Sequence, residues 1–319
     1  MTDRDLHLKI CNLSKVYNKD LFVKPFHAVT NLSCDFPRGQ CTGFMGHNGA
    51  GKTTTIKAIF GLIKPTKGKI LYNDKEIGRQ DKYQIGYMPE INKLPKNLSC
   101  EEILLSHLRI FKPKTEENLS PKSLVEQTLK KVDLWDYRKR HVSKLSKGMG
   151  RRLSWCQATI HNPDLIILDE PFSGLDPLGR QLMISLIREI KQSGKTIVLC
   201  THELWSVNEV CDHLHILQKG KLSYSTLNPV DTQPPKPLFN YQLSIAGIDL
   251  PVLAQLKDKY QLPEYDYHDQ KDKKHILGFA EYTDSCLWAK QAFGEGLIVT
   301  NFSKRPTFIE EDLYRFFIN

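Results

Sequence analysis

The segment at positions 46–53 constrains the fold of this chain more than any other. It matches the pattern G-x-x-x-x-G-K-[S/T], with a short apolar run before it at 40–45 and a run of helical spacing after it. A glycine-rich turn between a strand and a helix directs backbone N–H groups inward, and the helix adds the partial positive charge of its N-terminus. The pattern therefore predicts a phosphate-binding loop. Its residues, with Thr54, are candidates for holding a nucleotide: Gly46, His47, Asn48, Gly49, Ala50, Gly51, Lys52 and Thr53.

Two residues at the end of this phosphate loop have predicted roles. Lys52 is expected to reach the β- and γ-phosphates, and the hydroxyl of Thr53 is expected to bind Mg²⁺. The alternative is a chance glycine-rich turn, but it does not account for the strand and helix around the loop. The loop alone does not distinguish kinases, GTPases, motors and transporters, so the rest of the chain has to decide.

The residues around the loop alternate between strand-like and helical patterns. The continuous apolar runs at 165–168 and 196–200 suit parallel strands that are buried on both faces. Between them, apolar residues recur with helical spacing from 178 to 191, and Gly194 then supplies a helix stop. We therefore predict an α/β fold of the P-loop NTPase class with a mostly parallel sheet.

Residues from about 95 to 160 have a different pattern. Ser99 and Glu102 form a capping box that opens one helix, and further helices are expected near 124–132 and after Gly148. This segment is predicted to be a helical subdomain inserted between strands.

Two neighbouring carboxylates follow the apolar run at 165–168. Asp169 and Glu170 would lie at the carboxyl end of a buried strand, where α/β proteins bind their ligands. Asp169 would hold Mg²⁺, and Glu170 would act as general base on the attacking water. The alternative is a strand that simply ends in solvated acids, and the neighbouring motifs argue against it.

Three further motifs occur around the acidic pair. They are Leu145-Ser146-Lys147-Gly148-Met149, Ser173-Gly174-Leu175-Asp176, and His202. Together with the phosphate loop, the acidic pair and a switch-loop segment at 85–90, their order resembles that of the ABC ATPases over residues 5–225. The resemblance implies a P-loop NTPase fold with an ABC-type helical subdomain.

The resemblance also implies roles that no local pattern explains. Tyr17 would stack on adenine, and His202 would contact the γ-phosphate of ATP. Glu90 in the switch loop would bind Mg²⁺ together with Thr53 and Asp169. The signature residues would contact ATP held by a second copy of the chain, which implies a homodimer. These residues are Ser146, Lys147, Gly148 and Met149, and Asp176 belongs to the D-loop.

Some of these residues also fit simpler structural roles. Tyr17 fits an ordinary strand tyrosine, and His202 fits a cap of the helix that follows it. Asp176 precedes Pro177, a typical N-cap followed by a first-turn proline.

The motifs depart from the general family pattern at two places. The signature reads Leu-Ser-Lys-Gly-Met instead of Leu-Ser-Gly-Gly-Gln, and Glu90 stands where the family has glutamine. A carboxylate oxygen can bind Mg²⁺ as an amide oxygen does. Both departures resemble the drug-resistance-type exporter ATPases, which implies export, a bacterial source and a separate permease.

The chain divides near residues 228–237, which contain four prolines. We expect a nucleotide-binding domain at 1–229, a stiff linker at 230–237 and an accessory domain at 238–319. The last region reads strand, helix, strand, strand, helix, strand, helix. This order predicts a small α+β domain of the ferredoxin-like type.

Bulk properties limit the expected partners. No apolar run reaches the ~18–20 residues of a membrane span, and the N-terminus has no apolar leader. The net charge is +9, but no polybasic block is present, so nucleic acid is not an expected partner.

We predict a cytoplasmic ATPase subunit on the inner face of the cell membrane, which uses ATP and Mg²⁺ to drive a permease. The alternative is a soluble ABC ATPase acting on ribosomes or DNA, and the single cassette without sustained heptads argues against it.

The eight cysteines form no C-x-x-C pair and fit a reduced environment. Cys211, His213 and His215 alternate, so we expect them on one face of a strand. Without a fourth ligand nearby, strand-face residues are favoured over a metal site.

Overall fold

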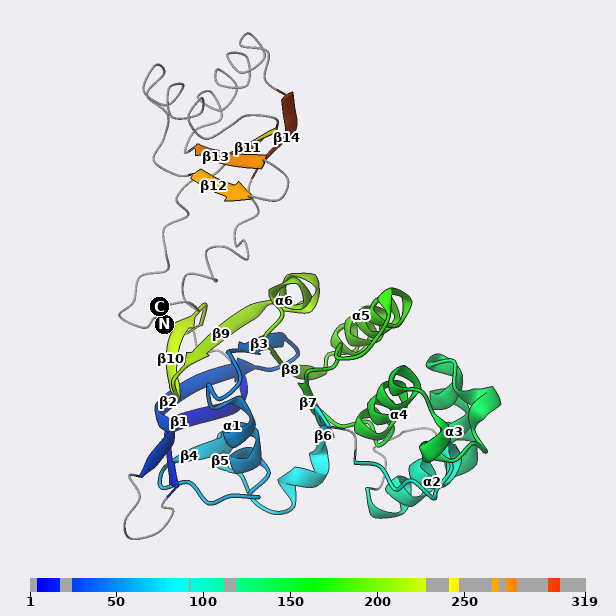
Figure 1. Cartoon of the computed structure of the whole chain (residues 1–319). Helices are drawn as coiled ribbons and strands as arrows, with labels where there is room; N and C mark the ends of the chain where they lie inside the picture. Colours follow the sequence, from blue (N-terminus) through cyan, green and yellow to red (C-terminus); the bar gives the residue numbers. More distant parts are fainter. Residues whose placement is uncertain are drawn as a thin grey trace, which may run out of the picture. The chain divides into compact units, whose positions relative to one another are not determined.

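The computed structural model describes residues 5–17, 25–91, 93–111 and 119–227, together with the backbone of four strands further along the chain. The chain divides into two compact units, Met1–Thr232 and Gln233–Asn319. The first unit contains two β-sheets with helices packed against them (Figure 1). This arrangement of sheets and helices agrees with the α/β fold that the sequence patterns predicted.

The larger sheet has the strand order β10-β9-β3-β8-β7-β6. The pairs β3–β8, β3–β9, β7–β8 and β6–β7 are parallel, and only the edge strand β10 pairs antiparallel. The predicted parallel arrangement is therefore confirmed. The strands are β3 (Cys41–Met45), β6 (Ile85–Met88), β7 (Leu165–Asp169), β8 (Thr196–Thr201), β9 (His213–Gln218) and β10 (Lys221–Ser225).

The smaller sheet is antiparallel, with the order β2-β1-β4-β5, and the sequence patterns did not predict it. Its two long strands lose their register at several places, for example between Ile10 and Leu13. Asn12 and Asn31 there have a positive φ of 49°, so the alternation of inward and outward side chains is interrupted. The strands are β1 (Leu6–Tyr17), β2 (Phe26–Pro37), β4 (Lys67–Tyr72) and β5 (Lys75–Glu76).

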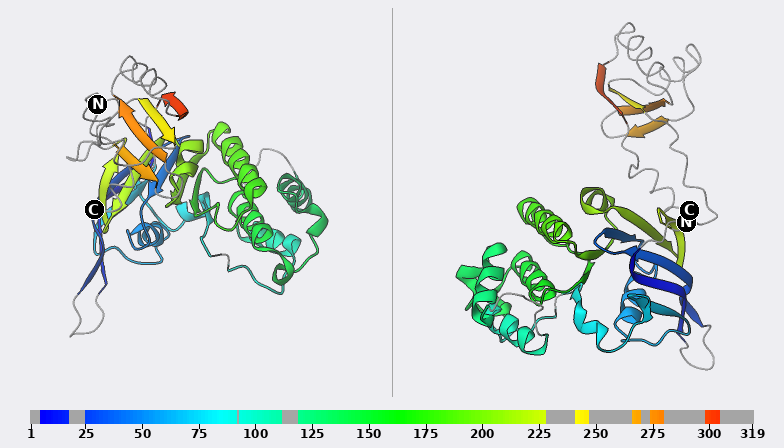
Figure 2. Two further views of the ribbon diagram at one scale, coloured as in Figure 1. Left: turned by 45° about the horizontal axis from the view of Figure 1, so that its top comes forward. Right: turned by 180° about the vertical axis from the view of Figure 1, so that it is seen from behind.

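The helices form two groups. The first follows strands of the larger sheet and comprises α1 (Lys52–Ile59), α5 (Pro177–Gln192) and α6 (Leu204–Val210). The second is the predicted helical subdomain, with α2 (Cys100–Ile110), α3 (Pro121–Lys131) and α4 (Lys147–Thr159). Figures 1 and 2 show this second group beside the β6–β7 edge of the larger sheet, away from the smaller sheet. Within the described ranges, no helix is long and apolar enough to cross a bilayer.

Local capping signals explain where these helices begin. The Ser99 side chain accepts the backbone N–H of Glu102 while the Glu102 carboxylate accepts that of Ser99, which confirms the predicted capping box. Ser120 caps α3, with Pro121 at the first turn, so α3 begins earlier than its apolar residues indicated. Short 3₁₀ turns at Asp81–Gln84, Trp135–Tyr137 and Val142–Lys144 connect the larger elements.

Two apolar clusters hold the first unit together. One lies between the two sheets and α1, and includes Phe36, Phe44 and Ile167. The other joins the helical subdomain to β7 and α5, and includes Trp155 and Leu168. Residues that alternate along β7 therefore contribute to different clusters, as expected for a strand that is buried on both faces.

The predicted common strand face of Cys211, His213 and His215 is wrong. Cys211 ends α6, and its Sγ lies 3.6 Å from the Sγ of Cys41. Within β9, His213 contacts the Gln40 side chain and His215 donates to the carbonyl of Asp35. Among the described residues, no three His, Cys, Asp or Glu side chains gather in a way that could hold a metal ion.

The second unit contains a four-stranded antiparallel sheet with the order β12-β13-β11-β14. Its strands are β11 (Tyr241–Ala246), β12 (Asp266–Asp269), β13 (Lys274–Phe279) and β14 (Ile298–Lys304). The three helices and the linker at 230–237 that the sequence predicted lie outside the described residues.

Candidate functional site

The phosphate loop connects the end of β3 to the start of α1. Gly51 has a φ of 108°, and a Cβ placed on it would lie 2.9 Å from the carbonyl oxygen of Ala28. A Cβ on Gly46 would lie 2.6 Å from the carbonyl oxygen of Leu217. Glycine is therefore required at both positions by close backbone approach, and at Gly51 also by its left-handed conformation.

Lys52, the first residue of α1, turns back over the loop. Its ammonium group donates to the carbonyls of Gly46 and His47 and is buried. The positive charge therefore lies at the centre of the loop, where a phosphate chain would meet it. His47, Asn48 and Gly49 remain exposed at the rim, while Ala50 is buried beneath them.

A pocket of about 150 Å³ lies in front of the loop. We call it the phosphate pocket. It is smaller than the roughly 300–1,000 Å³ of typical small-molecule sites, so it suits the phosphate end of a nucleotide. It is lined by Phe26, Ala28, His47, Asn48, Gly49, Gly51, Lys52, Thr53, Thr54, Glu90, Asp169 and Glu170.

Three carboxylates from two neighbouring strands meet in this pocket. Glu90 follows β6, and Asp169 and Glu170 lie at the end of β7, which is parallel to β6. The carboxyl ends of parallel neighbours lie at the same edge of a sheet, so residues far apart in sequence come together. Thr53 lines the same pocket, as the predicted Mg²⁺ set of Thr53, Glu90 and Asp169 requires.

The acidic surroundings change the chemistry of Asp169. Burial raises its pKa from 3.8 to about 6, and the charges of Glu90 and Glu170 add to the rise, while Lys52 and Arg151 oppose it. The ionised form of Asp169 is therefore poorly compensated by the protein alone. A cation in the pocket would relieve this repulsion.

Asp169→Asn is expected to stabilise the nucleotide-free protein near neutral pH. Because folding raises the pKa of Asp169 from 3.8 to about 6, the native state binds this proton more tightly than the unfolded chain does. Ionised Asp169 therefore lowers stability above pH 6, and the penalty disappears as the pH falls through 6 towards 4. A shift of about 2 units corresponds to about 3 kcal/mol, so urea unfolding at pH 7.5 should show a gain of that order and roughly half of it at pH 5.

The exposed Asp133 provides the control for this measurement, because Asp133→Asn is expected to change stability by about 0.5 kcal/mol at most. An Asp169→Asn variant that is no more stable than the parent at pH 7.5 would contradict the destabilisation of ionised Asp169 by burial and by the neighbouring carboxylates.

Glu170 and His202 are brought into direct contact. The Glu170 Oε1 atom lies 2.7 Å from Nδ1 of His202, and the hydroxyl of Thr201 donates to Oε2 at 3.2 Å. The contact arises because β7 and β8 pair with Asp169 opposite Cys200. His202 does not cap α6, whose N-cap position is taken by the next residue.

The two aromatic residues near the pocket differ in position. Tyr17 ends β1 and lies opposite Phe26 in the β1–β2 ladder, with the ammonium of Lys15 5.0 Å from its ring centroid. Phe26 lines the phosphate pocket and is 59% exposed, whereas Tyr17 is not among the lining residues. Phe26 belongs to none of the sequence motifs, and its large exposed fraction is visible only in the fold.

The signature residues lie outside the phosphate pocket of their own chain. Ser146 caps α4, and its Oγ accepts the backbone N–H of Met149 at 3.2 Å. Lys147 extends over Gly174, and Gly148 lies near Leu175, so the signature and the D-loop are adjacent. Asp176 caps α5 by accepting the backbone N–H of Gly179 at 2.8 Å, which confirms its predicted capping role.

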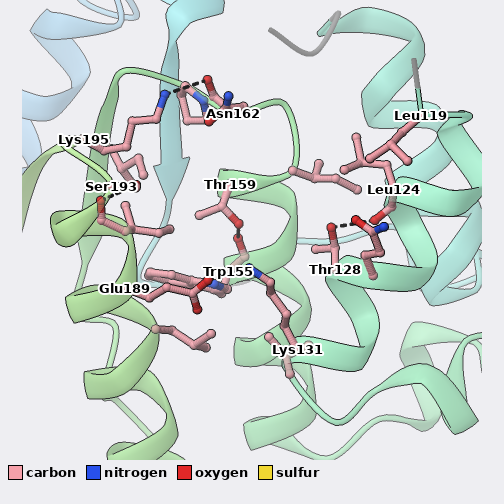
Figure 3. A pocket seen from close by; sticks show the side chains of 17 residues that line it. Leu119, Leu124, Thr128, Lys131, Trp155, Thr159, Asn162, Glu189, Ser193 and Lys195 are labelled. Atoms are coloured by element: carbon pink, nitrogen blue, oxygen red, sulfur yellow. Dashed lines mark hydrogen bonds and ion pairs between the residues drawn. The ribbon is translucent and has the colours of Figure 1, made fainter. Parts of the chain in front are cut away.

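A second pocket of about 360 Å³ lies between α3, α4 and α5 (Figure 3). Lys131 and Glu189 form an ion pair of 2.6 Å at its wall, and Lys195 pairs with Asp164 at 3.2 Å. Lys131 and Lys195 of this pocket therefore already have carboxylate partners, whereas the ammonium group of Lys52 in the phosphate pocket donates to backbone carbonyls.

Comparison with protein families matches residues 29–173 to the ABC transporter family. The chain is 36% identical over 196 residues to the uncharacterized ABC transporter ATP-binding protein YhaQ of Bacillus subtilis, a match that covers 61% of this chain and 65% of that protein. It is 36% identical over 223 residues to the bacitracin transport ATP-binding protein BcrA of Bacillus licheniformis, covering 67% of this chain and 68% of that protein. The chain thus spans about two thirds of the length of these relatives.

A solved structure of an ATP-binding subunit of an ABC transporter is similar to the first unit. It is 29% identical in sequence, with a TM-score of 0.60, and the match covers 68% of this chain and 88% of that one.

Proposed function

The chain belongs to the ATP-binding proteins of ABC transporters, ATPases that energise a membrane-spanning permease, and we propose that it drives export through ATP-dependent closure of a homodimer. The alternative of an ATPase acting on ribosomes or DNA is not favoured, because the relatives are transporter subunits. The observation that carries the proposal is the meeting of the phosphate loop, the acidic pair and His202 in one place, with the signature outside it.

In this proposal Lys52, Glu170 and His202 have separate tasks in hydrolysis. Lys52 and the backbone N–H groups of the loop hold the β- and γ-phosphates, because they direct positive charge into the pocket. Glu170 accepts a proton from water as the water oxygen attacks the γ-phosphorus and the bond to ADP breaks. His202 orients the Glu170 carboxylate through Nδ1, which leaves Nε2 for the γ-phosphate.

The donor set fits Mg²⁺, which is expected to bind with ATP. The pocket offers the Thr53 hydroxyl and the carboxylates of Glu90 and Asp169, all hard oxygen ligands. Mg²⁺ usually takes only one or two carboxylates together with phosphates and water, so a closed protein cage is not needed. When bound, the ion neutralises charge that develops on the phosphates. The raised pKa of Asp169, about 6, supports this fit, because it reflects the burial of the carboxylate first and the charges of Glu90 and Glu170 second.

The adenine ring is proposed to lie outside the phosphate pocket against aromatic side chains. Phe26 is exposed at the pocket edge, and Tyr17 is its partner across the ladder. We assign stacking to this pair instead of to Tyr17 alone. Aromatic stacking recognises a π-face without requiring a polar pocket.

The direction of transport is inferred from the two departures in the motifs. Met149 in the signature and Glu90 in the switch loop both follow the pattern of the drug-resistance-type exporter ATPases. We therefore place the protein on the inner face of the cell membrane, held there by an export permease.

A third, mostly apolar groove is the proposed contact with the permease. It has a volume of about 770 Å³ and is lined by residues that follow α1, by β6 and by α2. Leu62 at its edge is 71% exposed, and Pro89 in its wall directly precedes Glu90 of the phosphate pocket. A permease segment in this groove would therefore be one residue away from the nucleotide site. Arg79 and Lys82 in its lining favour a segment that also carries an acidic side chain.

Leu62→Glu is expected to lower co-purification with the permease by at least about tenfold, because it puts a charge into an apolar interface. The ATPase activity of the isolated chain should stay within twofold, since Leu62 does not line the phosphate pocket. Pull-down from detergent-solubilised membranes measures the first quantity, and phosphate release measures the second. Leu62→Met is the matched control and should bind normally. Equal recovery of permease with the Glu and Met variants would place the contact elsewhere.

We propose a ferredoxin-like fold for the accessory domain at 238–319. The sheet order supports it, because β11 and β12 both flank β13 in antiparallel fashion and are therefore parallel to each other. Two parallel strands separated by a third form the split βαβ unit of that fold.

Residues 1–229 alone are expected to bind ATP, because every predicted nucleotide contact precedes the proposed linker at 230–237. The dissociation constant of a fluorescent ATP analogue should agree within about twofold between residues 1–229 and the whole chain. A folded fragment that does not bind the analogue would show that the accessory domain completes the site.

A further inference from the structure

Arg151 is a buried charge that connects three separate segments of the chain. It lies on α4, only 3% exposed, and its guanidinium donates to four backbone carbonyls. One terminal nitrogen donates to Pro89 at 2.7 Å and to Glu90 at 2.8 Å. The other donates to Asp169 at 3.1 Å and to Glu170. The side chain therefore joins the signature helix to both acidic segments of the phosphate pocket.

The surroundings of Arg151 explain how the charge is tolerated. Burial lowers the pKa of Arg151, whereas the nearby charges of Asp169, Glu170 and Glu90 act in the opposite direction. Four carbonyl oxygens also solvate it in place of water. A planar guanidinium presents several donors in a fixed geometry, which one ammonium group on a flexible stem does not reproduce.

The backbone of Glu170 needs such support. Its φ is 49°, a left-handed conformation that is unfavourable for residues other than glycine. Its N–H donates to the carbonyl of Cys200 at 2.8 Å, and its own carbonyl accepts from Arg151. The conformation in turn directs the Glu170 carboxylate to His202.

We propose that Arg151 is a positioning residue that sets the backbone of Glu90 and Glu170 for hydrolysis and ties both to the signature helix. The inference rests on the proposed function, in which Glu170 is the general base. Contact of the signature with ATP across the dimer would act on the start of α4. Arg151 is one turn further along the same helix, so a shift of α4 would reach Glu90 and Glu170 through these hydrogen bonds.

Arg152 supplies a matched control on the same helix. Its guanidinium donates to the carbonyl of Val132 at 2.9 Å and lies 4.0 Å from the carboxylate of Asp133. It touches neither acidic segment among the contacts of the described residues. An Arg152→Lys change therefore tests the loss of a guanidinium from α4 while the four hydrogen bonds from Arg151 to backbone carbonyls are kept.

The test compares Arg151→Lys and Arg151→Gln with Arg152→Lys in the full chain. Each Arg151 variant is expected to lower kcat by about 10–100-fold, because a displacement of the catalytic carboxylate by about 1 Å has an effect of that size. The KM for ATP should stay within twofold of the parent value. Arg152→Lys should keep kcat within twofold. Rates are normalised to the folded fraction, measured by binding of a fluorescent ADP analogue. Normal kcat in the Arg151 variants, or failure of both to fold, would overturn the positioning role.

A double-mutant cycle with Glu170→Gln separates positioning from a general structural effect. If Arg151 acts through Glu170, adding Arg151→Lys to Glu170→Gln should lower the residual rate by a clearly smaller factor than Arg151→Lys lowers the rate of the parent. Multiplied losses would overturn the inference. If Glu170→Gln alone keeps normal turnover, the assignment of Glu170 as the base fails. This outcome can be told apart from failure of the Arg151 inference, because it is obtained without any change at Arg151.

Discussion

Glu170→Gln is expected to bind ATP normally and to hydrolyse it about 10²–10⁴-fold more slowly than the parent, the usual effect of losing a general base. The amide keeps the size of the carboxylate and can still contact His202 and Thr201, which lie 2.7 and 3.2 Å from the two oxygens of Glu170. It cannot accept the proton of the attacking water. Affinity should therefore survive while chemistry is lost. Single-turnover hydrolysis measures the rate, and a fluorescent ATP analogue measures binding.

Glu203→Gln is the matched control, because Glu203 follows His202 directly but is not among the residues that line the phosphate pocket. It should hydrolyse ATP at nearly the parent rate. If Glu170→Gln keeps more than about a tenth of the parent turnover, Glu170 is not the base, and the carboxylate of Glu90 becomes the next candidate.

The sequence patterns were informative wherever the physical cause is local. The capping box at Ser99, the N-cap at Asp176 and the continuous apolar run before Asp169 each depend on a few adjacent residues. The same is true of Gly51, where a left-handed backbone between a strand and a helix permits no side chain without strain. These local signals place the phosphate loop, the parallel strands and the helical subdomain.

Features that depend on distant parts of the chain were missed. The long antiparallel strands carry register shifts near Asn12, so no regular alternation is visible in their sequence. Nothing in the sequence distinguishes Arg151 from the neighbouring Arg152, yet only Arg151 faces the acidic segments. The contact of Glu170 with His202 follows from strand pairing, and no sequence pattern predicted it.

Each chain carries the two parts of an ATP site, the phosphate loop and the signature, at separate places, and we therefore expect two chains to assemble into a dimer. The phosphate loop begins α1 and the signature begins α4, and the signature does not line the phosphate pocket of the same chain. In a two-fold dimer each signature would close the ATP bound by its partner. ATP then favours closure because its γ-phosphate contacts the signature only in the closed state, a differential contact that ADP does not provide.

Glu170→Gln should therefore dimerise with ATP and Mg²⁺ and remain monomeric with ADP, and adding Gly148→Asp should abolish the dimer. A Cβ on Gly148 would lie 3.6 Å from Leu175, an ordinary contact, so the folded monomer accommodates the new side chain. The added carboxylate would face the phosphates of the opposite chain, where like charges repel at short distance. Light scattering should show a mass near twice that of one chain for the single variant only. A fluorescent ATP analogue should bind both variants with similar affinity, because Gly148 is outside the phosphate pocket of its own chain. A double variant that still dimerises with ATP would contradict the shared site, since the carboxylate would then meet no phosphate across the interface.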